Sequence, residues 1–267
     1  MDGMVEAGTT RMIARVEGPV GWMIFNNPDR RNAVSLDMWQ AVPRILAHFE
    51  ADRAIRVIAL AGEGGRAFVS GADISQFDQQ RSNADQVAHY DRIAGEASEA
   101  IKRTTKPTVA VIRGWCIGGG LGIAATCDLR FATEGSKFGV PAGKLGLGYA
   151  HPGVKTLMDI VGPAYTQEIF FTARHFSAAE AQTMGFVNRV IPDADFDAFV
   201  AGQLAMIAAN APLTLRALKT TVRELLRGSS ADLDLSRQQV AACFASDDYK
   251  EGRRAFTEKR PPLFHGR

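Results

Sequence analysis

The alternation of apolar and polar residues changes in character along the chain. Short runs rich in valine, isoleucine and leucine, bounded by glycine, proline or charged residues, are typical of strands. Such runs occupy residues 12–16, 21–25, 57–61, 108–112 and 129–132. Segments with the spacing or composition of helices follow several of them, at residues 35–49, 84–102 and 121–127. This alternation of strands and helices is compatible with stacked crossover units.

The pattern from Pro163 onward is mostly helical. Gly162-Pro163 is a signal for helix entry, and Ser177 to Glu180 fits a capping box. Further helices are expected over residues 213–226, 232–244 and 249–259. We therefore divide the chain into a core of residues 1–195 and a C-terminal helical region of residues 196–267.

Two glycine-containing turns are candidates for a site in which backbone amides bind a ligand oxygen. Gly118-Gly119-Gly120 lies between a buried strand and a helix, and Ser70-Gly71-Ala72-Asp73 follows another strand. Glycine lets a ligand oxygen approach the backbone, and the start of a helix offers unpaired N–H groups. Each turn alone is equally compatible with tight packing. Two such turns together could direct two amides at one oxygen, as in an oxyanion hole.

Many further motifs occur in a familiar order along nearly the whole chain. They are residues 26–28, 31–33, 67–74, 114–120, 127–130, 138–141, 171–174, 179–188 and 256–261. Taken together, they resemble the enoyl-CoA hydratase/isomerase family, also called the crotonase superfamily. The resemblance implies an α/β fold, a crotonase-like spiral of ββα units with a C-terminal helical trimerisation region.

The same resemblance implies a substrate and an assembly. The substrate would be an acyl-CoA thioester, with coenzyme A as part of the substrate and no separate cofactor or metal. The protein would be a homotrimer, or a hexamer built as a dimer of trimers.

The resemblance also assigns residues. The amides of Ala72 and Gly119 would form the oxyanion hole, and Asp73 would order its loop. Phe256 and Lys259 would complete the CoA pocket, commonly from a neighbouring subunit. The other substrate-binding or CoA-binding positions are Arg30, Arg31, Ala33, Ala67, Gly71, Ile74, Trp115, Gly118, Pro141 and Ala142. For the two arginines, a solvated loop charge is an equally good interpretation.

The chain departs from the hydratases at two catalytic positions. Where the family has its acid–base glutamates, this sequence has Gly122 and Ala142. Neither side chain can exchange a proton, and such groups typically contribute about 10²–10⁴-fold each to the rate. Replacement chemistry could come from Tyr149 and His151, because a phenol hydroxyl donates and accepts hydrogen bonds and histidine titrates near neutrality.

The segment around Tyr149 also partly resembles methylmalonyl-CoA decarboxylase. That branch has a histidine in its Gly-x-Asp-Ile loop, where this chain has Ala72. Three hypotheses therefore stay open: a hydratase/isomerase-type enzyme with unusual proton donors, a CoA-thioester decarboxylase or hydrolase, and a noncatalytic protein that binds CoA esters.

Composition adds few constraints. The chain has 267 residues, of which 46% are hydrophobic, enough for one large core. The formal net charge is +2, and no basic stripe with interleaved aromatic residues suggests a nucleic-acid partner. The three cysteines have no zinc-binding spacing and are expected to be reduced. Without a signal-peptide pattern or a long apolar run, we expect a cytoplasmic protein with no membrane association.

Overall fold

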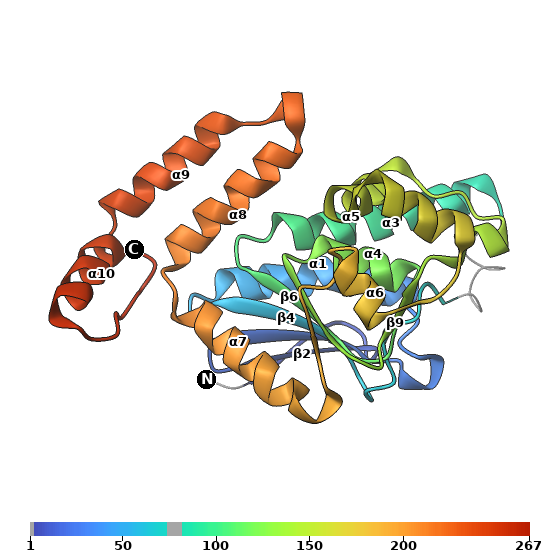
Figure 1. Cartoon of the computed structure of the whole chain (residues 1–267), viewed down its shortest axis with the longest axis horizontal. Helices are drawn as coiled ribbons and strands as arrows, with labels where there is room; N and C mark the ends of the chain where they lie inside the picture. The colour runs from blue at the N-terminus through green and yellow to red at the C-terminus, as the bar shows by residue number, and fades with distance from the viewer. Residues whose placement is uncertain (1–2, 74–81) are drawn as a thin grey trace.

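The computed structural model of the protein describes residues 3–73 and 82–267, and it contains two sheets (Figure 1). The larger sheet has seven strands in the order β1-β2-β3-β4-β6-β8-β11. Its strands are β1 (Gly3–Val5), β2 (Met12–Glu17), β3 (Val20–Phe25), β4 (Val57–Gly62), β6 (Thr108–Ile112), β8 (Leu129–Thr133) and β11 (Arg189–Ile191). The first three are antiparallel, and every pairing from β3 to β11 is parallel.

The smaller sheet has four short strands in the order β10-β9-β7-β5. They are β5 (Ala67–Val69), β7 (Trp115–Ile117), β9 (Lys137–Gly139) and β10 (Phe176–Ser177). Each of β5, β7 and β9 follows a strand of the larger sheet and precedes a helix. The chain thus repeats a ββα unit three times, which confirms the expected fold class of a spiral of such units.

The helices cover both faces of the larger sheet (Figure 1). One face packs against α1 (Leu36–Ala51), α3 (Ala84–Arg103), α4 (Gly119–Thr126) and α5 (His151–Thr172), whereas α7 (Phe196–Ala209) covers the other. Along β4, Ile58 and Leu60 join the first core and Val57 and Ala59 join the second. Both faces of the strand are therefore buried, which explains its continuous apolar run.

The remaining short elements connect these layers. They are the 3₁₀ helices η1 (Pro28–Arg30), η3 (Pro141–Leu145), η4 (Asp193–Asp195) and η5 (Gly228–Ser230), and the helix α6 (Ala178–Thr183). The capping box at the start of α6 is present as predicted: the Ser177 hydroxyl accepts from the Glu180 amide at 3.2 Å, and the Glu180 carboxylate accepts from the Ser177 amide at 2.7 Å.

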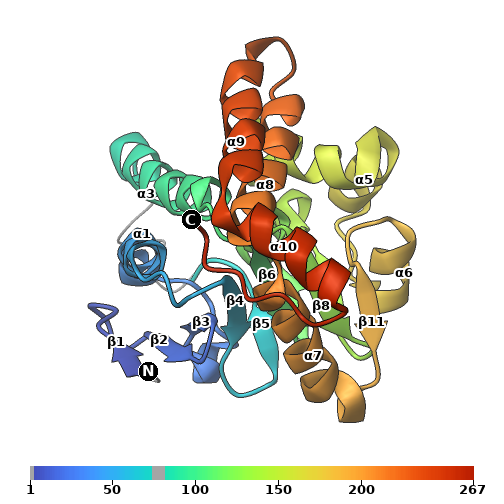
Figure 2. The same cartoon turned by 90° about the vertical axis from the view of Figure 1, so that its left-hand side faces the viewer.

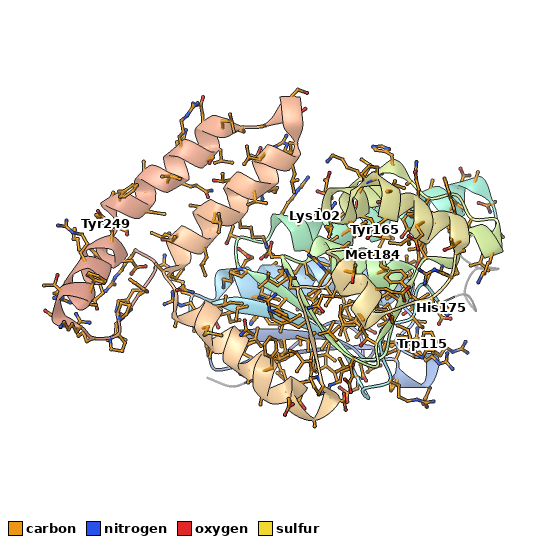
Figure 3. All side chains as sticks on the ribbon, in the orientation of Figure 1. Lys102, Trp115, Tyr165, His175, Met184 and Tyr249 are labelled. Carbon is orange, nitrogen blue, oxygen red and sulfur yellow. The ribbon has the colours of Figure 1, made fainter. Side chains whose placement is uncertain are left out.

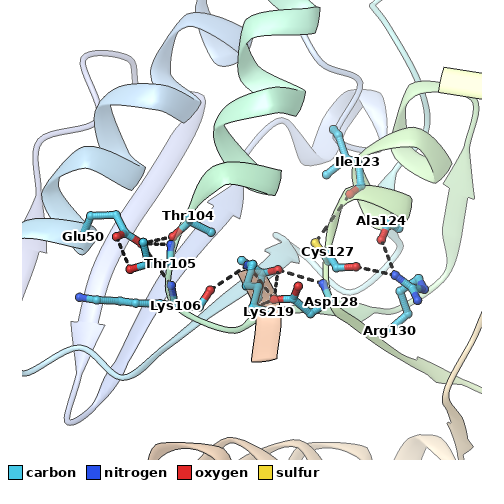
Figure 4. Close-up of polar contacts among 11 residues, drawn as sticks. Glu50, Thr104, Thr105, Lys106, Ile123, Ala124, Cys127, Asp128, Arg130 and Lys219 are labelled. Atoms are coloured by element: carbon cyan, nitrogen blue, oxygen red, sulfur yellow. Dashed lines mark hydrogen bonds and ion pairs between the residues drawn. The ribbon is translucent and has the colours of Figure 1, made fainter. Parts of the chain in front are cut away.

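Three C-terminal helices project away from this core (Figures 1 and 2). They are α8 (Pro212–Leu226), α9 (Leu233–Ala245) and α10 (Asp247–Glu258). The Lys219 ammonium attaches α8 to the core by donating to the Asp128 carboxylate at 2.7 Å and to the Lys106 carbonyl at 2.9 Å (Figure 4). An open apolar groove of about 920 Å³ runs along α8, α9 and α10.

The sequence located most long elements within a few residues, but it missed part of α5 and gave no separate helix for α7. We expected a helix to begin at Gly162-Pro163, whereas α5 begins at His151 and runs to Thr172. Gly162 has φ 75°, which breaks the helix at the predicted position. The first half of α5 was missed because its residues follow a glycine-rich segment that predicts a loop.

Candidate active site

The turn after β5 lies against the start of α4. Gly71 has φ 115°, a conformation that favours glycine. Val34 pairs with this turn through both of its backbone groups, because its amide donates to Gly71 at 2.8 Å and its carbonyl accepts from Asp73 at 3.0 Å. A Cβ atom added to Gly119 would lie 3.7 Å from the Ala72 nitrogen. The backbones of Ala72 and Gly119 are therefore close neighbours.

The three consecutive glycines, Gly118, Gly119 and Gly120, have different structural roles. Gly118 has φ 54°, and its amide donates to the Gly139 carbonyl at 2.8 Å. Gly120 allows α4 to pack on β5, since a Cβ atom there would lie 2.1 Å from the Val69 carbonyl oxygen. Gly119 begins α4, where amides lack partners within the helix. Within the described residues, neither the Gly119 amide nor the Ala72 amide donates a hydrogen bond.

The Tyr149 side chain lies beside Gly122. Its hydroxyl oxygen is 3.6 Å from the position that a Cβ atom of residue 122 would take. The ring makes an edge-to-face contact with Phe170, with centroids 5.0 Å apart. Burial raises the pKa of the Tyr149 hydroxyl, so the group is neutral at neutral pH. The hydroxyl can therefore donate a hydrogen bond or a proton but is not a base under those conditions.

Two further predicted site residues, Ala142 and His151, show no contact in residues 3–73 and 82–267 that indicates a catalytic role. Ala142 is buried in η3, which begins at Pro141, and its carbonyl accepts from Leu147 at 3.1 Å. His151 is the first residue of α5 and is exposed, and its side chain has no hydrogen bond or ion pair within the described part of the chain. Among the described residues, no hydrogen bond, ion pair or ring contact joins it to Tyr149.

A second group of predicted residues surrounds the loop at η1. The Arg30 guanidinium lies 3.8 Å from the Asp73 carboxylate, and the Arg31 guanidinium lies 5.8 Å from the centre of the Trp115 ring. Trp115 also contacts His175 edge to face, and Figure 3 shows both at one end of the molecule. These contacts connect Arg30 and Arg31 to the turn that carries Ala72 and to the strand that leads to Gly119.

Asn32, to which the sequence pattern assigned no role, fastens the loop of this candidate site by hydrogen bonds. Its buried side chain donates to the carbonyls of Glu63 at 2.9 Å and Ala67 at 2.7 Å, and accepts from the Asn27 amide at 2.9 Å. These bonds hold the η1 loop against the strand that leads to Gly71. Ala33 and Ala67 are buried beside them. The only signal in the sequence was the position of Asn32 within the motif Arg31-Asn32-Ala33.

The two C-terminal residues predicted to contact CoA are far from this group. Phe256 lies on α10 with 87% of its surface exposed, and Lys259 follows the helix in a left-handed conformation. Figure 3 shows Tyr249, which is also on α10, at the opposite end of the molecule from Trp115. One chain therefore does not bring Phe256 or Lys259 to the turns at Ala72 and Gly119. Ile74 lies outside the described residues.

Cys116 and Cys127 are buried and Cys243 is half-buried, and all three are free. Burial raises the pKa of Cys127 to about 12 and that of Cys116 well above its usual value, which makes both poor nucleophiles. Residues 3–73 and 82–267 hold no cluster of three metal-ligating side chains.

A helix that spans a bilayer needs about 20 consecutive, mostly apolar residues. No single helix among the described residues is long and apolar enough on its own, although the segments Asp193–Ala209 and Pro212–Leu226, bent by 100° where they meet, meet this requirement as a pair.

Sequence and structure comparisons with known proteins all identify the same family. The sequence profile described as enoyl-CoA hydratase/isomerase matches residues 15–267. The chain is 31% identical to enoyl-CoA hydratase EchA19 of Mycobacterium tuberculosis over 98% of this chain and 99% of that protein. It is 28% identical to the short-chain-enoyl-CoA hydratase of Clostridium acetobutylicum, over 93% and 95% of the two chains. An enoyl-CoA hydratase/carnithine racemase from Magnetospirillum magneticum has a similar crystal structure, with a TM-score of 0.93, 36% identity and 97% of both chains covered.

Proposed function

The chain belongs to the enoyl-CoA hydratase/isomerase family, and from this premise we propose that it stabilises the enolate of an acyl-CoA thioester in an oxyanion hole. The amides of Ala72 and Gly119 form that hole. One observation carries the proposal: two neighbouring backbones each present an amide with no acceptor among the described residues. The thioester carbonyl oxygen accepts from both amides, and the interaction strengthens as negative charge develops on that oxygen. The start of α4 adds a partial positive charge.

Tyr149 supplies the proton in this proposal. Gly122 and Ala142 have no ionisable group, whereas the Tyr149 hydroxyl lies 3.6 Å from the place where a side chain at residue 122 would begin. Because its pKa is raised by burial, the hydroxyl stays protonated near neutral pH. In hydration of an enoyl thioester, a water oxygen bonds to the β-carbon and the electron pair of the carbon–carbon double bond enters the enolate. The Tyr149 hydroxyl donates its proton to the α-carbon, and the proton lost by the added water returns through solvent to the phenolate oxygen.

Decarboxylation is a second candidate reaction, and one observation favours it. A neutral phenol cannot begin an enolate-forming reaction by removing a proton, and neither Gly122 nor Ala142 can replace it as a base. Loss of CO₂ from a malonyl-type thioester makes the enolate without a base: the bond between the α-carbon and the carboxylate breaks, and its electron pair enters the enolate. The hydroxyl of Tyr149 then protonates the α-carbon as before.

CoA itself is bound, in this proposal, by the η1 loop and by a second copy of the chain. Arg30 and Arg31 bring positive charge near the turn at Ala72, and cations bind phosphate strongly. Phe256 and Lys259 lie at the other end of the same chain, so they reach this site only from a neighbouring copy. The exposed Phe256 and the apolar groove along α8, α9 and α10 support assembly into a homotrimer or a dimer of trimers.

A turnover screen in D₂O tests the function directly. The purified protein is incubated with crotonyl-CoA, a saturated acyl-CoA and a malonyl-type CoA ester, and the products are identified by mass spectrometry. We expect turnover of one class with deuterium incorporated at the α-carbon. Release of free CoA alone would mean hydrolysis. Binding of CoA esters with no turnover and no deuterium incorporation would mean a noncatalytic binder, and either result would overturn the enolate proposal.

Tyr149→Phe tests the proton donor. The substitution removes one oxygen and keeps the ring contacts, so we expect the affinity for the CoA ester to change little. The turnover number should fall by about 10²–10⁴-fold, the usual contribution of an acid–base group. Tyr165→Phe, which removes a hydroxyl from a 37% exposed tyrosine on α5, is the control and should match the wild type. Equal rates for both variants would exclude Tyr149 as the donor.

A further inference from the structure

Gly153 lies against the ring of Tyr149. A Cβ atom added to Gly153 would lie 2.8 Å from one ring carbon of Tyr149 and 3.3 Å from the next. Non-bonded carbon atoms are normally about 3.5–4.0 Å apart, so a methyl group at residue 153 would force the ring to move. The space occupied by the ring therefore depends on the absence of a side chain at Gly153.

The local backbone gives no other reason for glycine at this position. Gly153 lies in the first turn of α5, and it is not among the glycines with positive φ. Inside a helix, glycine is less favourable than alanine by about 0.5–1 kcal/mol. The helix alone would therefore favour alanine here, whereas the contact with Tyr149 favours glycine.

The ring is bounded on its other sides by α4 and by the far end of α5. Phe170 meets it edge to face with centroids 5.0 Å apart, and the hydroxyl lies 3.6 Å from the Cβ position of Gly122. A methyl group at residue 153 would push the ring away from the first turn of α5. The hydroxyl would move with the ring, because the two are rigidly joined.

We propose that Gly153 is a positioning residue. Because it has no side chain, the Tyr149 ring can occupy the space next to it, and this keeps the Tyr149 hydroxyl beside Gly122. The inference rests on the proposed role of Tyr149 and adds a determinant of its geometry. Proton transfer is sensitive to placement, and a displacement of about 1 Å can cost about 10²-fold in rate. Gly153 thus acts on the reaction without touching the substrate.

The test is a double-mutant cycle between residues 149 and 153. Gly153→Ala should lower the turnover number at least about tenfold in the wild-type background, with a smaller change in KM. In the Tyr149→Phe background it should change neither, because the displaced ring no longer carries the reacting hydroxyl. Gly148→Ala is the matched control: it makes the same change in the same segment, and its Cβ atom would have no neighbour within 4 Å.

The outcomes separate this inference from the proposed function. If Tyr149→Phe keeps the wild-type rate, the role of Tyr149 fails and the positioning role fails with it. If Tyr149→Phe is slow but Gly153→Ala is as fast as Gly148→Ala, only the inference about Gly153 is overturned. A loss that is equal in the wild-type and Tyr149→Phe backgrounds would also overturn it.

A second variant covers the case in which Gly153→Ala does not fold. Leucine at residue 149 is shorter than tyrosine and leaves room for the added methyl group. The double variant Gly153→Ala/Tyr149→Leu should therefore recover the soluble yield and the melting temperature of Tyr149→Leu. If the yield is lost in both Gly153→Ala variants, glycine is needed by α5 itself and the proposal is wrong.

Discussion

At the scale of single residues, Gly119 has only a backbone amide to contribute. This makes the oxyanion hole testable with two substitutions at one position. Alanine keeps the N–H group, and its Cβ atom would have ordinary contacts of 3.7 Å with its nearest neighbours. Proline removes the N–H group at the first residue of α4, a position where helices commonly tolerate proline.

We expect Gly119→Pro to lower the turnover number by about 10²–10³-fold, which is the effect of losing one oxyanion-hole donor. Gly119→Ala should stay close to the wild type in both turnover and melting temperature. Turnover is measured on whichever CoA ester the screen identifies. If both variants lose activity equally, the defect comes from the added side-chain atoms, and the amide is not the group that matters.

The residue scale also shows what the sequence could and could not predict about the site. The identities of Gly122 and Ala142 could be read directly, and with them the fact that neither side chain carries a carboxylate. The closeness of Tyr149 to Gly122 could not, since it depends on how α4 packs against α5. The proposed role of Gly153 could not be predicted from the sequence for the same reason, because it depends on one contact with the Tyr149 ring across a turn.

At the scale of elements, the capping box of α6 couples helix stability to pH. Hydrogen bonds from the Ser177 amide and hydroxyl, and then from Arg174, lower the pKa of the Glu180 carboxyl from 4.5 to about 2. A carboxyl whose folded pKa is depressed stabilises the fold above its unfolded pKa. Its contribution is therefore complete above about pH 4.5 and is lost as the pH falls toward 2.

Ser177→Ala should lower the free energy of unfolding by about 1 kcal/mol at pH 7, as is usual for loss of an N-cap. The difference from the wild type should shrink as the pH falls below 4.5, because the wild type then loses the hydrogen bond from the Ser177 hydroxyl to the Glu180 carboxylate, which the variant lacks at every pH. Urea unfolding across that range measures it. Ser246→Ala is the control: Ser246 caps α10 by accepting from the Tyr249 amide, and its hydroxyl has no hydrogen bond to a carboxylate of residues 3–73 or 82–267. A pH-independent Ser177→Ala effect would contradict the coupling.

The elements of the two sheets differ in how well the sequence predicts them. In the larger sheet, the strands β2, β3, β4, β6 and β8 have five or six residues each and are rich in apolar residues, and all five were predicted. The strands of the smaller sheet have two or three residues each, so no periodicity can be seen in them. Yet β7 leads directly into Gly118, and the turn at Ala72 follows β5. The missed strands are thus the ones that bring the two turns together.

At the scale of the whole molecule, the apolar groove along α8, α9 and α10 predicts an assembly. Phe244 lies in this groove with 63% of its surface exposed. We expect light scattering to give the mass of three or six chains, and Phe244→Asp to give a single chain. Met4→Asp changes a residue that is 74% exposed on β1 and should leave the mass unchanged.

The same variants test whether the CoA site is shared between copies. Lys259→Ala should weaken CoA-ester binding measured by calorimetry, and the monomeric Phe244→Asp should weaken it at least as much, because it removes the whole partner surface. A monomeric variant with wild-type affinity would mean that one chain binds CoA alone, with Lys259 and Phe256 outside the site.

The order of the strands in space has a consequence for how the protein is made. In both sheets the strands lie side by side in the order in which they occur in the chain. Domains can fold during synthesis, N-terminal segments first. Each strand that leaves the ribosome therefore finds its partner already in place, with no need to insert between strands that have paired. Until β11 arrives, β8 is an open edge that other chains could pair with. Slow translation between β8 and β11 therefore prolongs the time during which this edge can pair with another chain.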